Sequence, residues 1–194
     1  MEHKHHGKSS AKFFNAGEIL SELNLKGDET FMDAGCGDGY ISKEAIGRLP
    51  DGMVYAVDVY DEAIIGMDEY KNKNNISNLI NIQADITKDI PGINDESVDV
   101  ILMINVFHGF KASDEMDEVA LNLKKLLKTG GKLAIVDFKP IEMEFGPPME
   151  IRCSHVEIEN VFEKHGFEKE YLNVEIGEDT TEGKSHFLIM FEKE

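Results

Sequence analysis

Short apolar segments alternate with helical patterns along most of the 194-residue chain, and this alternation limits the fold more than any other feature. Segments 30–35, 53–59, 79–85, 97–106 and 132–138 have the composition of strands. Segment 97–106 is almost continuously apolar, as expected of a strand that is buried on both faces. The alternation predicts a doubly wound, mainly parallel α/β sheet with helices on both faces, because parallel strands are joined by crossover helices.

Start and stop signals place helices between these strands. We expect a short helix after a cap at Asn15, and further helices over 40–49 and 61–73. The clearest helical pattern runs from a cap at Ser113 to a stop at Gly130-Gly131. Its first turns are acidic and its last turn is rich in lysine, which the helix dipole favours at both ends.

The C-terminal part of the chain departs from the alternation. Ser154 and Glu157 have the spacing of a capping box for a helix that ends near residue 166. Two strand patterns follow, over 167–176 and 185–193, and a polar turn joins them. We therefore expect the sheet to end in an antiparallel pair.

The polar start of the sequence predicts an N-terminal arm over residues 1–14, and no repeat or long linker divides residues 15–194, which we expect to form one domain. The arm carries His3, His5 and His6. Histidines can bind a divalent metal, but without a further ligand an arm with no metal is the prediction.

Charge and cysteine content exclude several classes of protein. The formal net charge is −18, and Arg48 and Arg152 are the sole arginines, so we expect no nucleic-acid partner. A small or neutral substrate is expected instead. No apolar run has the length of a membrane span and no signal peptide is recognisable, which predicts a cytoplasmic protein with no membrane partner. Cys36 and Cys153 form neither a disulfide framework nor a zinc knuckle.

Three glycines follow the first predicted strand at alternate positions, in the stretch DAGCGDGY. Alternate glycines allow positive φ angles and let a ligand approach the main chain. A dinucleotide-binding loop has the spacing G-x-G-x-x-G, but here Tyr40 stands at the position of the third glycine. Asp33 precedes the loop, and its charge disfavours a pyrophosphate. The loop therefore favours an adenosyl compound with a sulfonium and an amino group over a dinucleotide.

The stretches DAGCGDG and VYAVDV resemble the glycine-rich loop and second strand of class I S-adenosylmethionine-dependent methyltransferases. The resemblance continues through QADI, SVDVILMINVFHGF and LKKLLKTGGKLAIVDF, over about residues 15–140, and is strongest to the UbiE-like, or type 11, group. It implies a Rossmann-like seven-stranded sheet with one antiparallel strand. It also implies S-adenosylmethionine as cofactor and transfer of its methyl group to a small-molecule acceptor by in-line displacement.

The resemblance implies a set of cofactor-binding residues that lie at or just after strand ends. Those expected to contact the methionine and ribose parts are Asp33, Gly35, Cys36, Gly37 and Gly39. Asp58, with Val59 beside it, is expected to accept hydrogen bonds from both ribose hydroxyls. Ala84 and Asp85 would contact the adenine, and Asn105 the methionine part. Each aspartate can instead cap a helix or brace a loop.

His108, just after the fourth strand, is the candidate general base for an acceptor that must lose a proton. The alternative is a histidine packed among Phe107 and Phe110 and hydrogen-bonded to the main chain. Asp137 and Lys139 follow the fifth strand and are either near the acceptor or solvated loop charges.

Arg152 follows the stiff stretch Gly146-Pro147-Pro148 and has two interpretations, an anion-binding residue for the acceptor or a surface ion pair with a neighbouring glutamate. Two other functions stay open beside methyl transfer. One is a nicotinamide-dependent oxidoreductase, which the glycine spacing disfavours. The other is a protein that binds S-adenosylmethionine without turnover.

Overall fold

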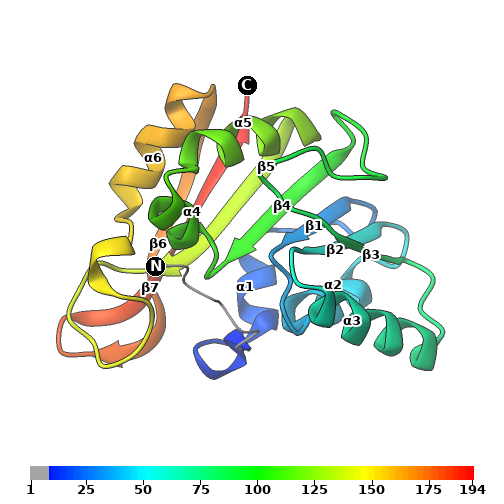
Figure 1. Cartoon of the computed structure of the whole chain (residues 1–194), viewed down its shortest axis with the longest axis horizontal. Helices are drawn as coiled ribbons and strands as arrows, with labels where there is room; N and C mark the ends of the chain where they lie inside the picture. Colours follow the sequence, from blue (N-terminus) through cyan, green and yellow to red (C-terminus); the bar gives the residue numbers. More distant parts are fainter. Residues whose placement is uncertain (1–8) are drawn as a thin grey trace.

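Seven strands make up the sheet of the computed structural model, which describes residues 9–194. They are β1 (Thr30–Ala34), β2 (Met53–Asp58), β3 (Leu79–Gln83), β4 (Val98–Ile104), β5 (Leu127–Phe138), β6 (Phe167–Thr180) and β7 (Gly183–Lys193). Their order in the sheet is β3-β2-β1-β4-β5-β7-β6 (Figure 1). Strands β1 to β5 are parallel, and β7 is antiparallel to both β5 and β6. The predicted sheet is therefore confirmed, including its one antiparallel strand.

Six α-helices and two short 3₁₀ helices accompany the sheet in the described part of the chain. They are η1 (Ser10–Lys12), α1 (Ala16–Glu22), α2 (Tyr40–Arg48), α3 (Asp61–Asn74), α4 (Phe107–Ser113), α5 (Met116–Leu126), η2 (Met149–Ile151) and α6 (His155–Lys164). Asn15 caps α1 through a hydrogen bond from the Glu18 N–H, and Ser154 and Glu157 form the predicted capping box of α6.

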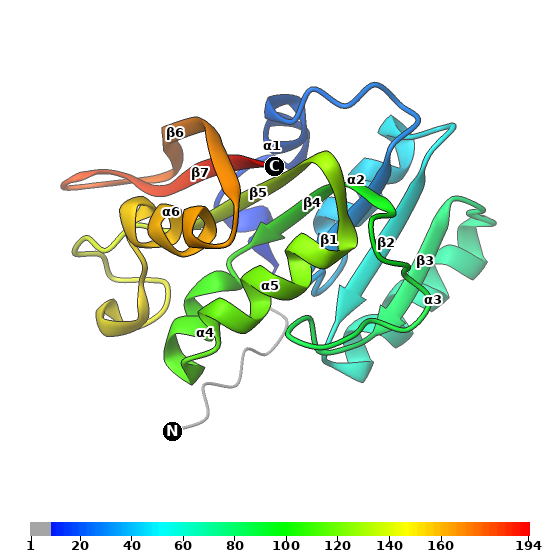
Figure 2. The same ribbon diagram turned by 90° about the horizontal axis from the view of Figure 1, so that it is seen from above.

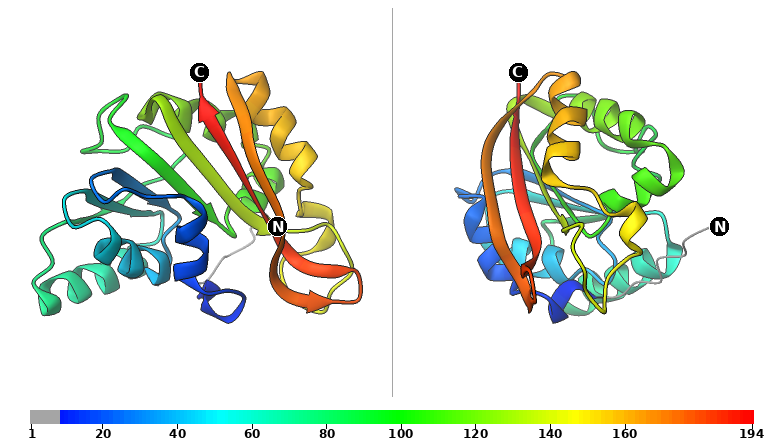
Figure 3. Two further views of the ribbon diagram at one scale, coloured as in Figure 1. Left: turned by 180° about the vertical axis from the view of Figure 1, so that it is seen from behind. Right: turned by 90° about the vertical axis from the view of Figure 1, so that its left-hand side faces the viewer.

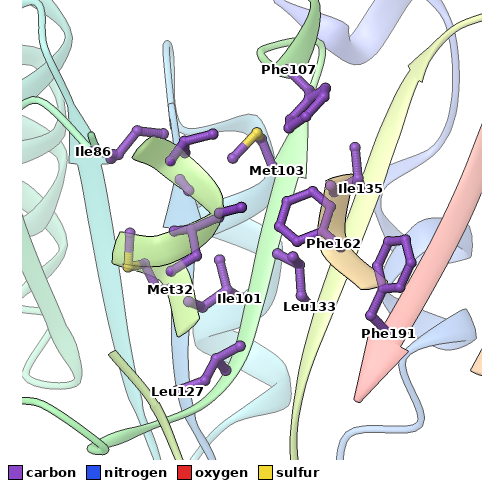
Figure 4. Close-up of a cluster of buried hydrophobic side chains, with 14 of the residues drawn as sticks. Met32, Ile86, Ile101, Met103, Phe107, Leu127, Leu133, Ile135, Phe162 and Phe191 are labelled. Atoms are coloured by element: carbon purple, nitrogen blue, oxygen red, sulfur yellow. The ribbon is translucent and has the colours of Figure 1, made fainter. Parts of the chain in front are cut away.

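The sheet is covered on both faces, so alternate residues of its central strands enter two different cores. In β4, Ile101 and Met103 belong to one buried cluster, and Leu102 and Ile104 to the other. The first cluster lies under α4, α5 and α6, and the second under α1, α2 and α3 (Figure 2). Figure 4 shows the first cluster. This burial explains why residues 97–106 are apolar without alternation.

The helical pattern predicted from Ser113 to Gly130 is wrong at both ends. Ser113 is the last residue of α4, and its hydroxyl has two acceptors within reach, Glu115 Oε2 at 2.6 Å and the Gly109 carbonyl at 3.2 Å. Asp114 has a φ of +62°, which ends α4 before α5 begins. At the other end, Leu127 is already extended and pairs with Val98, so β5 begins there and runs through the two glycines.

Strands β3 and β6 form the two edges of the sheet, and β6 and β7 extend together as a long hairpin (Figure 3). Between residues 9 and 194, no helix is long and apolar enough to cross a membrane. Residues 9–14 at the start of the described chain pack against the domain, where Phe13 lies 5.2 Å from Phe138 between ring centroids. His3, His5 and His6 lie outside the described residues.

Candidate functional site

A cavity of about 1150 Å³ lies at the carboxyl ends of the parallel strands, where ligands bind in open α/β sheets. Nearly all the site residues predicted from the sequence line it. They are Asp33, Gly35, Cys36, Gly37, Asp58, Val59, Ala84, Asp85, Asn105 and His108. Gly39 does not line the cavity. The structure thus brings together residues that are up to 75 positions apart in the sequence because five strands end at the same edge.

The three loop glycines have positive φ angles but different surroundings. A Cβ on Gly35 would lie 2.5 Å from Val106 Cγ2, and one on Gly39 would lie 1.9 Å from Met67 Sδ. Gly37 has a φ of +52°, and a Cβ there would meet no atom within 4 Å. Gly35 and Gly39 therefore allow close packing within the protein, whereas Gly37 keeps the wall of the cavity open.

Asp58 connects the end of β2 to the glycine-rich loop. Its Oδ2 accepts a hydrogen bond from the Gly37 N–H at 2.8 Å, and its Oδ1 accepts one from the Tyr60 N–H at 3.0 Å. The main chain adds to this connection, because the N–H groups of Gly35 and Cys36 both donate to the Val57 carbonyl. Each carboxylate oxygen of Asp58 keeps a second acceptor position, so the side chain can hold the loop and still accept from a ligand.

Asp33 is buried at the end of β1 and braces the start of α2. Its Oδ2 accepts hydrogen bonds from the Ser42 hydroxyl at 2.6 Å and the Ser42 N–H at 3.1 Å. Burial raises its pKa to about 7, although the bonds from Ser42 favour the ionised form. The bracing interpretation of Asp33 therefore holds in the structure, and the carboxyl group also borders the cavity.

The raised pKa of Asp33 has a defined effect on stability. Its contribution to the free energy of unfolding is fully present below the unfolded pKa of about 3.9 and is lost as pH rises through about 7. Relative to an Asp33→Asn variant, wild type should lose about 1.4 kcal/mol per pH unit within this window. Urea unfolding of both proteins from pH 5 to pH 8 measures the difference. A stability difference that stays constant with pH would mean that Asp33 is ionised throughout. The control is Asp51→Asn, which changes an exposed carboxylate just before β2.

The N–H groups around the loop leave little for a pyrophosphate to bind. Gly37 donates to Asp58, Gly39 to the Cys36 carbonyl, Tyr40 to Asp38 at 3.2 Å and Ser42 to Asp33. Three of these four acceptors are carboxylates, which repel a phosphate where a dinucleotide-binding loop would attract one. The geometry therefore fits a ligand that carries positive charge.

The part of the cavity formed by residues after β2 and β3 has apolar side chains at its rim. Val59 is 54% exposed although its side chain is apolar, and Ala84 and Ile86 also line this part of the cavity. Asp85 borders it with a carboxylate that accepts from Thr87 Oγ1 and from Lys88 Nζ, both at 2.7 Å. Burial raises the pKa of Asp85, but these hydrogen bonds outweigh it and keep the pKa below its usual value.

Asn105 occupies the turn after β4 with a φ of +57°, in the left-handed region that asparagine tolerates best among residues with a side chain. Its amide nitrogen donates to Ser10 Oγ at 3.3 Å. Its Oδ1 is buried and has no hydrogen-bond partner among the described residues. A buried acceptor without a partner beside a cavity fits a ligand with a donor group, such as an amine.

His108 and Asp137 form a buried pair between α4 and the end of β5. The carboxylate is 0% exposed, and His108 Nδ1 lies 2.8 Å from Asp137 Oδ1. The His108 N–H donates to Asp137 Oδ2 at 2.9 Å, so the carboxylate holds both the ring and the main chain. Burial alone raises the pKa of Asp137, but the imidazole and these hydrogen bonds keep it below its usual value. An ionised carboxylate only accepts, so the proton of a neutral His108 is on Nδ1.

Both interpretations of Arg152 are wrong. Its side chain is buried, and the guanidinium donates to three carbonyls of one loop, those of Pro147 at 2.8 Å, Ile141 at 2.6 Å and Phe145 at 3.1 Å. Three of the five guanidinium N–H groups therefore hold the loop after β5 in place, and Arg152 does not line the cavity.

Neither cysteine has the properties of a nucleophile. Both thiols are free and buried, and burial raises the pKa of Cys36 and of Cys153. Within residues 9–194, no group of three or more His, Cys, Asp or Glu side chains is placed to hold a metal ion.

The strand order, the loop after β1 and the acidic residue at the end of β2 define a class I S-adenosylmethionine-dependent methyltransferase. Comparison with protein-family models agrees, because the methyltransferase-domain family matches residues 25–187. The chain therefore belongs to this methyltransferase family, and its cofactor is S-adenosylmethionine. The comparisons do not specifically confirm the UbiE-like group. The nicotinamide-dependent alternative is set aside.

Solved structures give the same result. A SAM-dependent methyltransferase from Aquifex aeolicus is 29% identical, with a TM-score of 0.79 over 93% of this chain and 90% of that one. A type 11 methyltransferase, described as putative, from Sulfolobus solfataricus is 24% identical, with a TM-score of 0.68 over 92% of each chain. A TehB-like SAM-dependent methyltransferase from Corynebacterium glutamicum is 20% identical, with a TM-score of 0.67 over 93% and 88%. The last two show the fold alone. A search of curated protein sequences found no match.

The sequence did not predict three features of the site. Asp137 was expected near the acceptor or in solvent, but it is buried against His108, and its position at the end of an apolar strand was the available signal. Ser42, the partner of Asp33, lies in a helix and has no distinguishing pattern. Phe13 lines the cavity although it belongs to the predicted polar arm.

Proposed function

We propose that this methyltransferase transfers the methyl group to a small molecule, which binds in the same cavity, and that His108 accepts the proton that the acceptor loses. The observation that carries the proposal is the His108–Asp137 pair, which borders a cavity large enough for cofactor and acceptor together. S-adenosylmethionine supplies a methyl group on a sulfonium, and the protein must align the acceptor and exclude water.

The cofactor-binding role that we propose for the loop rests on the space at Gly37 and on the acceptors around it. Gly35, Cys36 and Gly37 would face the methionine and ribose parts, with Asp33 behind them and the unpartnered Oδ1 of Asn105 nearby. Gly39 supports this loop from outside the cavity.

The adenosine end is proposed to lie between β2 and β3. The two oxygens of Asp58 have acceptor positions for the ribose hydroxyls, beyond those that the main chain uses. The exposed side chain of Val59 and the small side chain of Ala84 would contact the adenine ring. Asp85 would accept from the adenine amino group in addition to Thr87 and Lys88.

His108 has the geometry of a general base. Its Nδ1 lies 2.8 Å from Asp137 Oδ1, and we assign the uptake of the proton to the other ring nitrogen, Nε2. Asp137 also stabilises the imidazolium that forms, because its charge is buried and lies 2.8 Å away.

Titration with S-adenosylhomocysteine tests the site assignment without an acceptor. Asp58→Ala should weaken binding by at least about 1 kcal/mol, roughly fivefold, because a hydrogen bond to a charged group contributes at least this much. Asp51→Ala removes an exposed carboxylate at the other end of β2 and should leave the affinity unchanged.

Equal affinity of Asp58→Ala and wild type would remove Asp58 from the site. NAD should not bind to either protein, since carboxylates occupy the N–H groups that its pyrophosphate needs. Binding without turnover is the remaining alternative, and a screen for S-adenosylhomocysteine formation with candidate acceptors separates it from catalysis.

A further inference from the structure

Aromatic side chains form the part of the cavity that the proposed cofactor residues leave open. Phe13 follows η1, Phe110 lies in α4 and Phe138 ends β5, and Pro147 adds an apolar surface from the loop after β5. These residues come from four separate segments of the chain. Together they give the proposed acceptor side of the cavity an apolar wall.

Contacts behind this wall fix the orientation of its rings. Phe13 meets Phe138 edge to face at 5.2 Å and lies nearly parallel to Phe145, 5.6 Å away with an interplanar angle of 29°. Phe145 belongs to the loop whose carbonyls Arg152 holds. Because Phe13 and Phe138 are held by contacts with other rings, this part of the wall is a preformed apolar surface.

Among residues 9–194, few basic side chains lie on this side of the cavity. Arg152 donates to three carbonyls, Arg48 is bonded to Glu44, Ser21 and Gly17, and neither arginine lines the cavity. Burial lowers the pKa of His186, which packs against Phe138, to about 4, so this imidazole is neutral.

Two lysines line the cavity among the described residues, and neither is placed to receive a buried anion. Lys43 donates to the Asp38 carbonyl at 2.6 Å, and Lys12 is exposed with its ammonium over the Phe13 ring. Within residues 9–194, six residues with carboxyl groups line the same cavity, namely Asp33, Asp38, Asp58, Glu62, Asp85 and Glu115. A carboxylate or phosphate on the acceptor would be desolvated there without compensation.

We infer that the acceptor is an electrically neutral molecule with a flat apolar body and a hydroxyl group, and that acceptors bearing carboxylate or phosphate are rejected. The inference rests on the proposed function, since it assigns the substrate class of that site. In the reaction, the hydroxyl proton passes to His108 Nε2 and the oxygen bonds to the methyl carbon. The carbon–sulfur bond breaks with its electron pair left on sulfur, so one positive charge passes from sulfonium to imidazolium.

Binding of four related probes to the protein saturated with S-adenosylhomocysteine tests this assignment. 2-Naphthol is neutral and flat, 2-naphthoate and 2-naphthyl phosphate are flat anions, and decahydro-2-naphthol is neutral but not flat. 2-Naphthol should bind at least about tenfold more tightly than either anion, because the anions lose hydration without a partner. It should bind about threefold or more tightly than decahydro-2-naphthol, which cannot stack on the rings.

Matched variants locate the binding surface. Phe13→Leu removes a ring from the wall and should weaken 2-naphthol binding about threefold to tenfold. Phe14→Leu alters the next residue, which does not line the cavity, and should change the affinity less than twofold. Circular dichroism of both variants checks that each is folded.

Binding of either anion as tight as or tighter than that of 2-naphthol would overturn the inference. If the anion then no longer binds to the Lys12→Gln variant, Lys12 is the residue that binds it. Absence of binding by all four probes, or an equal effect of the two phenylalanine variants, would overturn the inference as well. These outcomes do not depend on turnover. Failure to form S-adenosylhomocysteine with any acceptor would instead count against the proposed function.

Discussion

Gly39→Ala should lower the free energy of unfolding by roughly 2–5 kcal/mol, although Gly39 does not line the cavity. Two costs combine in this estimate. A side chain at a φ of +73° costs about 1–2 kcal/mol, and overpacking costs typically about 1–3 kcal/mol. The new Cβ would lie 1.9 Å from Met67 Sδ, and Met67 is 1% exposed, so its side chain has little room to move.

Gly37→Ala is the matched comparison, and it should affect cofactor binding more than stability. Its φ of +52° carries a similar backbone cost of about 1–2 kcal/mol, but no atom lies within 4 Å of the new Cβ. The methyl group enters the space proposed for the cofactor, so affinity for S-adenosylhomocysteine should fall at least about tenfold while the protein stays folded. Urea unfolding and calorimetric titration of both variants measure the two effects.

A double mutant separates the two costs at Gly39. In a Met67→Ala background the steric conflict is gone, so Gly39→Ala should then cost only the backbone term of about 1–2 kcal/mol. The same penalty with and without Met67 would show that the contact between the two residues does not limit this position.

The residues at strand ends were predictable because a strand pattern fixes where the sheet edge lies. Asp33, Asp58, Asp85 and Asn105 lie at or just after the ends of β1 to β4, and all four line the cavity. A parallel sheet brings such positions together whatever their separation in the sequence. The local pattern therefore carried three-dimensional information.

Pairs formed across the fold were not predictable from local patterns. The three carbonyls that Arg152 binds, and the imidazole that Asp137 binds 29 positions away, depend on how loops settle against the sheet. The prediction that a helix begins after Ser113 failed for a related reason. Ser113 followed by acidic residues is a valid cap signal, but Asp114 in the left-handed region ends one helix before the next begins.

His108→Ala and Asp137→Asn should each reduce methyl transfer to a neutral hydroxyl acceptor by roughly 10²–10⁴-fold, the usual contribution of general acid–base catalysis. The two changes act through one atom. Removing the imidazole removes the proton acceptor. Replacing the carboxylate with an amide offers a donor to His108 Nδ1, which moves the ring proton to Nε2 and leaves no basic nitrogen toward the acceptor.

Three measurements distinguish this role from a structural one. Affinity for S-adenosylhomocysteine should be unchanged in both variants, and ¹⁵N NMR should report the proton of neutral His108 on Nδ1 in wild type and on Nε2 in Asp137→Asn. The depressed pKa of Asp137 stabilises the fold above its unfolded pKa of about 3.9 and ceases to do so as pH falls through the folded pKa. The stability difference between wild type and Asp137→Asn should therefore shrink on acidification.

The surface pair of His165 and Asp117, with His165 Nε2 2.7 Å from Asp117 Oδ1, offers matched controls that lie outside the cavity. His165→Ala and Asp117→Asn should leave turnover within about twofold of wild type, because neither residue lines the cavity. Full turnover of His108→Ala would assign the buried pair to packing alone. A loss of turnover in Asp137→Asn with the ring proton still on Nδ1 would mean that the carboxylate acts through its charge on the imidazolium rather than through the tautomer.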